Sequence, residues 1–176
     1  TTDVDLFREG TFQIETDMDY EGIINYLQSE GELETVEVTF YEGMNVLQMA
    51  QLLEENGVCT ADEFTDAINN NDFSDYWCVK DIDTTEGTYY KLEGYLFPNQ
   101  YQFYANGAED LDSIIGKMLN SFEDNLENED LVDAIKKSGY SYREIITLAS
   151  IIQAEAKDVD DMYMISAVLH NRLESG

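Results

Sequence analysis

SYREIITLASIIQAEAK, residues 141–157, carries the strongest helix signal in the chain. Ser141 is followed three positions later by Glu144, the spacing of a capping box in which each side chain satisfies a backbone N–H. Apolar residues then recur at helical spacing, namely Ile145, Ile146, Leu148, Ala149, Ile151 and Ile152. The stretch therefore predicts an amphipathic helix that packs its apolar stripe against the rest of the protein.

Glu155 continues this apolar stripe, because it lies three residues after Ile152 and seven after Leu148. A carboxyl in that position is expected to be buried, and desolvation would raise its pKa, as a general acid near neutral pH requires. The same pattern also fits a glutamate that turns outward at the helix end, or one that pairs with Arg143 or Arg172. The pattern alone leaves these alternatives open.

The composition limits the classes of partner. The chain of 176 residues has 38 acidic and 9 basic residues, a formal net charge of −29. Nucleic-acid binding needs patches of Lys and Arg that neutralise phosphates, so this composition excludes it. A hydrophobic content of 43% still indicates a globular protein with a core. With one histidine and no CxxC pattern, we expect neither a structural zinc site nor a cofactor.

Cys59 and Cys78 are the two cysteines. In an oxidising compartment they could form a disulfide, and otherwise they are two small buried hydrophobic residues. No signal peptide and no apolar run long enough to cross a bilayer is present. Because the chain opens on Thr1 without a methionine and ends abruptly on Gly176, we expect it to be an excised part of a longer protein.

Apolar periodicity predicts an α+β fold. Alternation favours strands at residues 10–15 and 36–41. Helices are expected at 18–28, at 46–53 with a cap at Asn56 and Gly57, from Thr60 with its capping partner Glu63, and at 111–122, 130–138 and 162–173. The segment that follows residue 69 is polar and is expected to be rich in loops. We therefore expect an approximate domain boundary near residue 85.

Seven aromatic residues lie within residues 88–107, TYYKLEGYLFPNQYQFYANG, which Pro98 divides into two expected extended segments. Aromatic rings interleaved with polar groups suit carbohydrate, because sugars present apolar C–H faces that stack on tyrosine. The alternative is that these aromatics form the core of a β-layer. Glu93 is a carboxylate within this aromatic setting, or an exposed acid in a turn.

Four blocks in this order resemble the MltG/YceG-like endolytic transglycosylases. They are GTFQIE with the following residues 17–27, VTFYEGMNVLQMAQLLEENGV (38–58), LEGYLFPNQYQF (92–103), and LASIIQAEA (148–156) followed by SAVLHNRL (166–173). The resemblance implies a LysM-like strand/helix region over residues 1–85, followed by a mixed α/β catalytic domain over residues 86–176. The family continues into a Q-x-D-P-T-x-x-Y region that is absent here, so the catalytic domain is expected to be C-terminally truncated and inactive by itself.

The resemblance also implies a function. Such an enzyme is a lyase that cuts the MurNAc–GlcNAc bonds of nascent peptidoglycan strands and leaves 1,6-anhydro-MurNAc ends, without a cofactor. It would act at the extracytoplasmic face of the bacterial cell membrane, anchored by an N-terminal transmembrane helix absent from this chain, and beside penicillin-binding proteins. A non-catalytic peptidoglycan-binding module, or a scaffold for cell-wall synthases, is the alternative.

The essential glutamate of the family matches Glu155 here. Many members have Glu where this chain has Gln153, but Gln153 lies about 200° from Glu155 around the helix, so the apolar stripe favours Glu155. As residues that line the cleft or contact the glycan, we expect Glu93, Tyr95, Tyr101, Gln153, Asn171 and Arg172. Asn171 and Arg172 fit a role in helix packing equally well.

Overall fold

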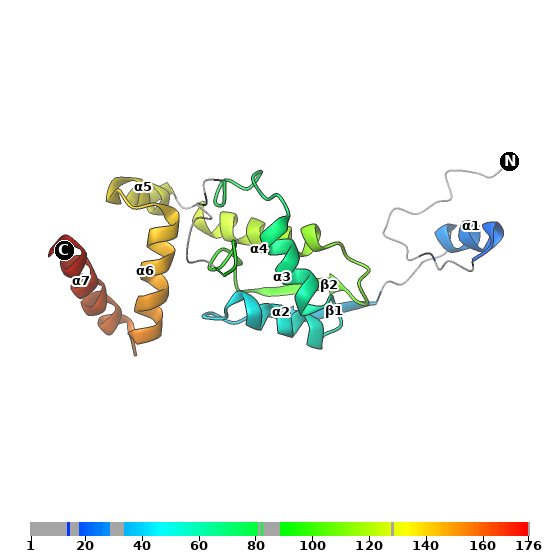
Figure 1. Ribbon diagram of the computed structural model, residues 1–176, viewed down its shortest axis with the longest axis horizontal. Coiled ribbons are helices and arrows are strands. Elements are labelled where there is room, and N and C mark those ends of the chain that lie inside the picture. Colours follow the sequence, from blue (N-terminus) through cyan, green and yellow to red (C-terminus); the bar gives the residue numbers. More distant parts are fainter. Residues whose placement is uncertain are drawn as a thin grey trace.

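β1 (Thr35–Thr39) and β2 (Gln100–Tyr104) form a small antiparallel sheet within a mostly helical chain. The computed structural model describes residues 14, 18–28, 34–80, 82, 89–127 and 129–175. The helices are α1 (Tyr20–Gln28), α2 (Val46–Glu55), α3 (Ala61–Asn70), α4 (Leu111–Leu126), α5 (Glu129–Ser138), α6 (Tyr142–Glu155) and α7 (Val159–Ser175) (Figure 1). This mixture of helices and strands confirms the α+β class. The expected strand at 10–15 lies almost entirely outside the described residues.

The two strands pair so that one face of the sheet is apolar. Val36 lies opposite Phe103 and Val38 opposite Tyr101. The other face is polar and exposed, where the Gln100 amide donates to the Glu37 carboxylate at 2.8 Å. This alternation is typical of an antiparallel sheet with one side on a core and the other in water.

Helix starts follow the capping signals in the sequence. Thr60 and Glu63 form a complete capping box at α3, and Ser141 and Glu144 form one at α6, as predicted. Asn45 also caps α2 through a capping box with Gln48, although the sequence analysis did not single out this pair. Each box satisfies backbone N–H groups that the first turn of a helix leaves without a partner.

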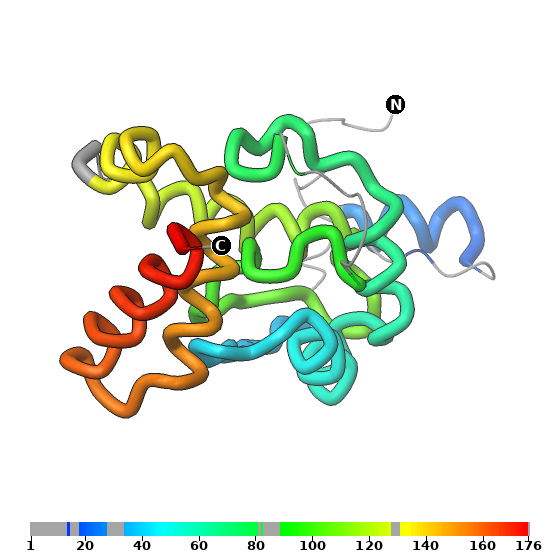
Figure 2. Tube along the Cα trace, turned by 60° about the vertical axis from the view of Figure 1, so that its left-hand side comes forward, coloured from blue at the N-terminus to red at the C-terminus, as the bar shows by residue number. Residues whose placement is uncertain are grey.

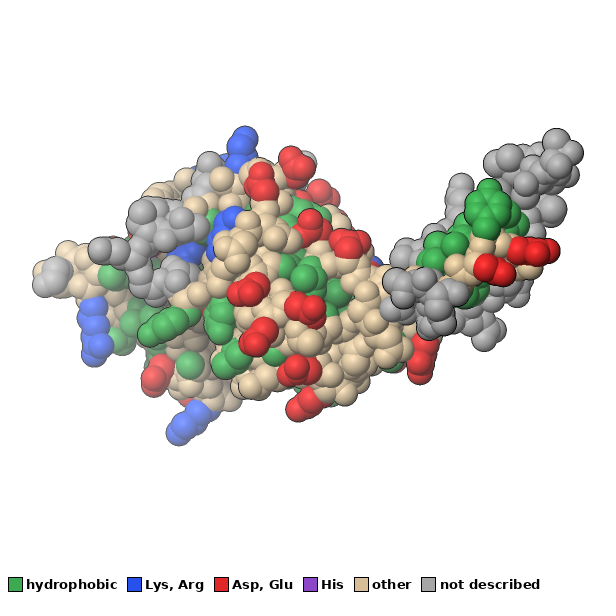
Figure 3. Space-filling model, turned by 45° about the vertical axis from the view of Figure 1, so that its right-hand side comes forward, with side chains coloured by type: hydrophobic (Ala, Val, Ile, Leu, Met, Phe, Trp, Pro, Cys, Tyr) green, Lys and Arg blue, Asp and Glu red, His purple; other side chains and the backbone are tan. Residues whose placement is uncertain are grey.

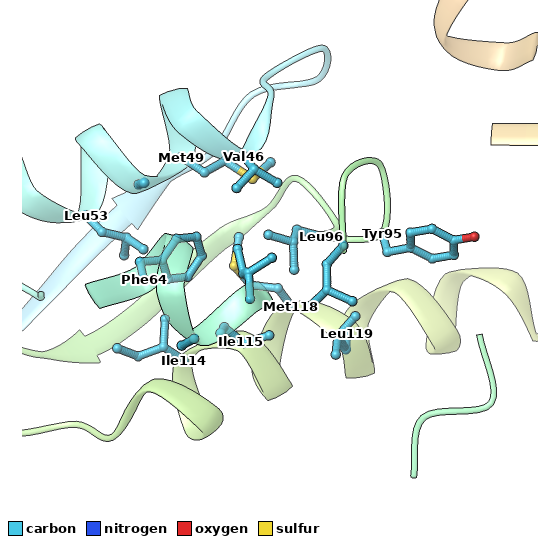
Figure 4. Close-up of a cluster of buried hydrophobic side chains, with 14 of the residues drawn as sticks. Val46, Met49, Leu53, Phe64, Tyr95, Leu96, Ile114, Ile115, Met118 and Leu119 are labelled. Carbon is cyan, nitrogen blue, oxygen red and sulfur yellow. The ribbon is translucent and has the colours of Figure 1, made fainter. Parts of the chain in front are cut away.

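One hydrophobic core lies between the sheet, α2, α3 and α4, and Figure 4 shows α2 and α4 on either side of it. Its largest fully buried side chains include Tyr95, Phe64, Phe103, Leu53, Ile68 and Leu92. Tyr95 packs on Phe122 with ring centroids 5.5 Å apart, and the Tyr101 hydroxyl donates to the carbonyl of Phe97 at 2.8 Å. Much of the aromatic stretch at residues 88–107 therefore belongs to the core. This agrees with the interpretation of these aromatics as core residues.

The boundary expected near residue 85 falls inside this packed unit. β1 and β2 lie on opposite sides of that boundary in the sequence and are nevertheless hydrogen-bonded partners. Side chains from both sides of it also share the same core. Two extended segments were expected around Pro98. The one after it is β2, whereas residues 89–96, before it, form turns.

Of the two alternatives left open for the cysteines, the structure has the unbridged one. Cys59 and Cys78 are free thiols in it. Burial, with a smaller contribution from Glu63, raises the pKa of Cys59 to about 11. Burial and Glu123 together raise the pKa of Cys78 to about 12. Both thiols are therefore protonated and unreactive near neutral pH, as small buried hydrophobic residues are.

The C-terminal helices pack less tightly than the core. No residue of α6 or α7 is fully buried. α6 touches the core mainly through Ile146, and the ring of Tyr142 lies 5.4 Å from that of Trp77. α1 stands apart from the core on the other side (Figure 1). Within the part of the chain that the structure describes, no helix is both long and apolar enough to span a bilayer.

The contact between α6 and the core depends on a glycine. Gly94 has φ +86°, and a Cβ added to it would lie 2.5 Å from Cγ2 of Ile146. Such a distance is too short for two carbon atoms, so α6 can lie here only because residue 94 has no side chain. Gly57 has φ +69° too, but nothing lies within 4 Å of where its Cβ would be.

This pair of glycines gives a matched test. We expect Gly94→Ala to lower the free energy of unfolding by about 2–4 kcal/mol, because it adds a steric clash to the cost of a left-handed backbone. Gly57→Ala should lower the free energy of unfolding by only about 1–2 kcal/mol, the cost of the left-handed backbone without a clash. Urea unfolding measures both. Fluorescence of Trp77, which contacts Tyr142 of α6, should change in Gly94→Ala alone, and equal effects of the two variants would contradict this account.

Glu109 is a buried carboxylate that ties β2 to α4. It accepts hydrogen bonds from the Tyr104 N–H and the Ser113 hydroxyl, both at 2.9 Å, and pairs with Lys117. We expect Glu109→Ala to lower the free energy of unfolding by about 2–3 kcal/mol, because buried donors lose a charged acceptor. Asp133→Ala, which removes an exposed ion pair with Lys137 at 3.9 Å, should cost less than about 0.5 kcal/mol. A smaller loss for Glu109→Ala than for Asp133→Ala in thermal unfolding would refute this.

Candidate functional site

A groove of about 1050 Å³ separates the core from the side of α6. One wall is the turn at residues 41–45 between β1 and α2, and another is the turn segment 89–98 that precedes β2. Residues of α6 from Arg143 to Ala154 form the side that faces them. Figure 2 shows α6 lying beside both turns, although they are far apart in the sequence.

Glu93 lies in this groove at the N-terminus of α2. Both of its carboxylate oxygens are 3.3 Å from the N–H of Val46, the first residue of that helix. Burial raises the pKa of Glu93, and the hydrogen bond from Val46 opposes this in part. Glu93, which was predicted from the sequence to line a cleft, is one of the residues that line this groove. Its carboxylate also connects the two turns that form the groove.

Gln153 lines the groove from α6. Its side-chain nitrogen approaches Gly43 and lies 3.7 Å from where a Cβ on that glycine would be. Three residues on the facing turn, Glu42, Gly43 and Asn45, were not among the predicted site residues. The signal that the sequence offered for them was the segment EGMN, in which a glycine lies close to two polar residues.

Tyr95 and Tyr101 are placed in the core and not in the groove. Only 1% of Tyr95 and 8% of Tyr101 is exposed. A ligand in the groove therefore cannot stack on either ring without opening the core. Tyr41 and Tyr89, with 68% and 93% of their surface exposed, line the groove instead.

Glu155 is not among the residues that line the groove. It lies about 140° from Ser150 and about 200° from Gln153 around α6, so it faces away from the groove. The expectation that Glu155 would be buried is wrong for the described chain, because its side chain is exposed. The stripe that contains Leu148 and Ile152 is only half-buried.

Asn171 and Arg172 lie near the opposite end of the α6–α7 pair. The neighbouring His170 faces Tyr140, just before α6 begins, with ring centroids 5.7 Å apart. Glu155 is the last residue of α6, about 20 Å further along that helix. The structure therefore does not bring Asn171 or Arg172 to Glu155. Among the described residues, no three His, Cys, Asp or Glu side chains gather as a metal-binding group.

The raised pKa of Glu93 predicts a specific pH dependence. The folded chain holds this proton more tightly than the unfolded chain does, so stability falls as the pH rises from about 4.5 through the raised pKa. Glu93→Gln keeps an acceptor for Val46 but cannot titrate. Its free energy of unfolding relative to the unsubstituted chain should therefore increase across this range. Urea unfolding at several pH values tests this, with exposed Glu42→Gln as the control, and a constant difference for Glu93→Gln would disprove it.

The sequence model of the YceG-like family matches residues 1–176. The endolytic murein transglycosylase of Bacillus subtilis (strain 168) is 26% identical over 176 residues, covering 96% of this chain and 48% of the relative. That of Streptococcus pneumoniae serotype 2 (strain D39) is 27% identical over 183 residues, covering 94% of this chain and 32% of the relative. The chain thus spans about half or less of the length of these relatives.

A solved structure supports the fold. The crystal structure of a yceG-like protein from Listeria monocytogenes aligns with a TM-score of 0.67 and 22% identity, covering 90% of this chain and 54% of that chain. At this identity the likeness concerns the fold alone. The match of the family model to the whole sequence carries the assignment, and the chain belongs to the YceG-like family.

Proposed function

We propose that this chain is part of an endolytic peptidoglycan lytic transglycosylase. The observation that carries the proposal is the match of the YceG-like family over residues 1–176, together with curated relatives named endolytic murein transglycosylase. The proposed reaction cleaves MurNAc–GlcNAc bonds of nascent strands and leaves 1,6-anhydro-MurNAc ends. Because murein lies outside the cytoplasmic membrane, the reaction would take place on that side.

Glu155 is the proposed catalytic residue. In its protonated form it donates to the glycosidic oxygen as the bond to C1 breaks, and its carboxylate then takes the proton of the muramic C6 hydroxyl as that oxygen attacks C1. One residue is acid and then base, so a second carboxylate nucleophile is not required, unlike in retaining hydrolases. No water enters the product.

The position of Glu155 at the end of α6 bears on this mechanism. Its exposed side chain is accessible to a long polymer, as cleavage within a strand requires. A general acid near neutral pH also needs a desolvated carboxyl, and the described residues do not bury this one. In the proposed mechanism the bound strand covers Glu155 and removes water from it.

Further parts of the proposal rest on the resemblance. The LysM-like region first expected over residues 1–85 is proposed to extend to β2, because β2 is the partner of β1. Penicillin-binding proteins are proposed partners of an enzyme held by an N-terminal membrane anchor. α2 and α3 lie between β1 and β2 in the sequence and cover their apolar face, an arrangement compatible with a small strand-and-helix module. Gln153 and Glu93 remain proposed glycan contacts.

The proposal is tested by Glu155→Gln in the full-length protein. Release of anhydro-muropeptides from purified sacculi should fall by about 100-fold or more, because an amide cannot donate or accept the proton. Mass spectrometry of the soluble products measures this. Glu54→Gln, an exposed residue of α2, is the matched control and should release normal amounts. Normal release by Glu155→Gln would exclude Glu155 as the acid.

A further inference from the structure

The small sheet has two outer edges, one on each strand. The N–H of Phe40 donates to the carbonyl of Asn99 at 3.0 Å, beyond one end of the pair. The N–H of Ala105 donates to the carbonyl of Glu34 at 2.8 Å, beyond the other end. Even-numbered residues of β1 therefore bond to β2, and the residues between them point their backbone groups away from it. The outward-pointing residues are Thr35, Glu37 and Thr39 on β1, and Gln100, Gln102 and Tyr104 on β2.

Side chains cover the outer edge of β2. The N–H of Tyr104 donates to the Glu109 carboxylate at 2.9 Å. The carbonyl of Gln102 accepts a hydrogen bond from Nζ of Lys117, also at 2.9 Å. These two side chains belong to α4 and to the segment just before it. The outer edge of β2 is therefore occupied and cannot readily pair with another strand.

The outer edge of β1 has no such cover in the described part of the chain. None of the hydrogen bonds between described residues uses the N–H or C=O groups of Thr35, Glu37 or Thr39. Within the same residues, no helix or strand other than β2 runs along β1. Free backbone groups on an edge strand can each bond to an extended chain, so such an edge is a template for an added strand.

We propose that the outer edge of β1 binds an extended, positively charged peptide segment of another protein as a third strand of the sheet. The backbone of this segment would bond to Thr35, Glu37 and Thr39, and its Lys or Arg side chains would lie beside the Glu37 carboxylate. The groove and Glu155 take no part in this interaction, which is separate from the proposed chemistry.

Charge selects the kind of partner. Glu34 and Glu37 are exposed, the protein carries a net charge of −29, and Figure 3 shows acidic side chains scattered over the surface of the core. Opposite charges on neighbouring strands stabilise their pairing, and like charges directly opposite each other destabilise it. A second copy paired symmetrically about the middle of this edge would place Glu37 against Glu37 of a molecule that carries the same net charge. The edge therefore favours a basic segment over a second copy.

The two faces of the sheet determine the side-chain pattern of the added strand. Successive side chains of a strand point to opposite faces. Side chains on the face of Glu37 would meet a carboxylate and water, so Lys and Arg suit these positions. Side chains on the other face would lie next to Val36, which is half-buried and leaves apolar surface there. A segment that alternates basic and apolar residues therefore matches both faces.

Calorimetric titration of the full-length protein with the acetylated peptide KVKVKVK tests the proposal. Glu37→Gln removes only the charge and should weaken binding by about 3- to 5-fold. Glu37→Pro also removes the central N–H of the edge, where proline is tolerated, and should weaken binding by about 30-fold. Gln102→Pro is the matched control, because Gln102 lies opposite Glu37 and its N–H faces the other edge, so the affinity should stay unchanged. Thermal unfolding confirms that each variant is folded.

Two further peptides separate strand addition from simple attraction between charges. KVKVKVK that is N-methylated at the amides facing β1 keeps its charge but cannot donate to the edge, so it should bind at least about 10-fold more weakly. The same peptide with glutamate in place of lysine should not bind detectably. Equal affinity of the methylated and unmethylated forms would overturn the proposal, because only the net charge would then be recognised. Absence of binding by KVKVKVK would overturn it too.

Hydrogen exchange identifies what occupies the edge. The N–H groups of Thr35, Glu37 and Thr39 should exchange rapidly in the protein alone, and KVKVKVK should slow their exchange by about 10-fold or more. Slow exchange in the monomer without peptide would show that another segment of the same protein covers the edge. A dimer that Glu37→Pro dissociates would show that a second copy does. Either result would overturn the proposal.

Discussion

The pairing of β1 with β2 determines most of the structure. It joins residues that are more than 60 positions apart, with Val38 opposite Tyr101. The chain leaves β1 into the turn at 41–45 and enters β2 from the turn segment at 89–98, so one antiparallel pair sets these two turns side by side. Glu93 then joins them through the N–H of Val46. A groove between distant segments follows from strand register and one hydrogen-bonded carboxylate.

α6 is held against this groove by small contacts and not by a large apolar interface. Ile146 fits over Gly94, and Gln153 approaches Gly43. Both glycines have positive φ, so each allows the chain to turn. Each also lets a side chain of α6 come close to the backbone, because glycine has no side chain of its own. α6 therefore lines the groove with one of its sides and also contacts α7. The separation of Gln153 from Glu155 is therefore a consequence of helical geometry at a lightly packed site.

Local features were predictable from the sequence and nonlocal ones were not. The capping boxes at Thr60 and Ser141 are correct because their hydrogen bonds involve residues three apart. No local signal reports that β1 pairs with β2, so a boundary drawn near residue 85 from composition did not anticipate the core shared across it. Helical periodicity placed Glu155 correctly on the stripe with Leu148. It could not say how far that stripe would be covered, and in the described chain Leu148 and Ile152 are half-buried while Glu155 is exposed.

Glu93 and Glu155 show why side-chain identity alone did not identify the environment. The sequence favoured Glu155 as the desolvated carboxyl, from an apolar stripe, and left Glu93 open as an exposed turn residue. In the structure Glu93 is half-buried with a raised pKa, while Glu155 faces water. Desolvation depends on what surrounds a side chain, and the N-terminus of α2, from a distant part of the sequence, lies against Glu93. Glu155, the last residue of α6, is exposed, so an apolar stripe on its own helix did not supply that cover.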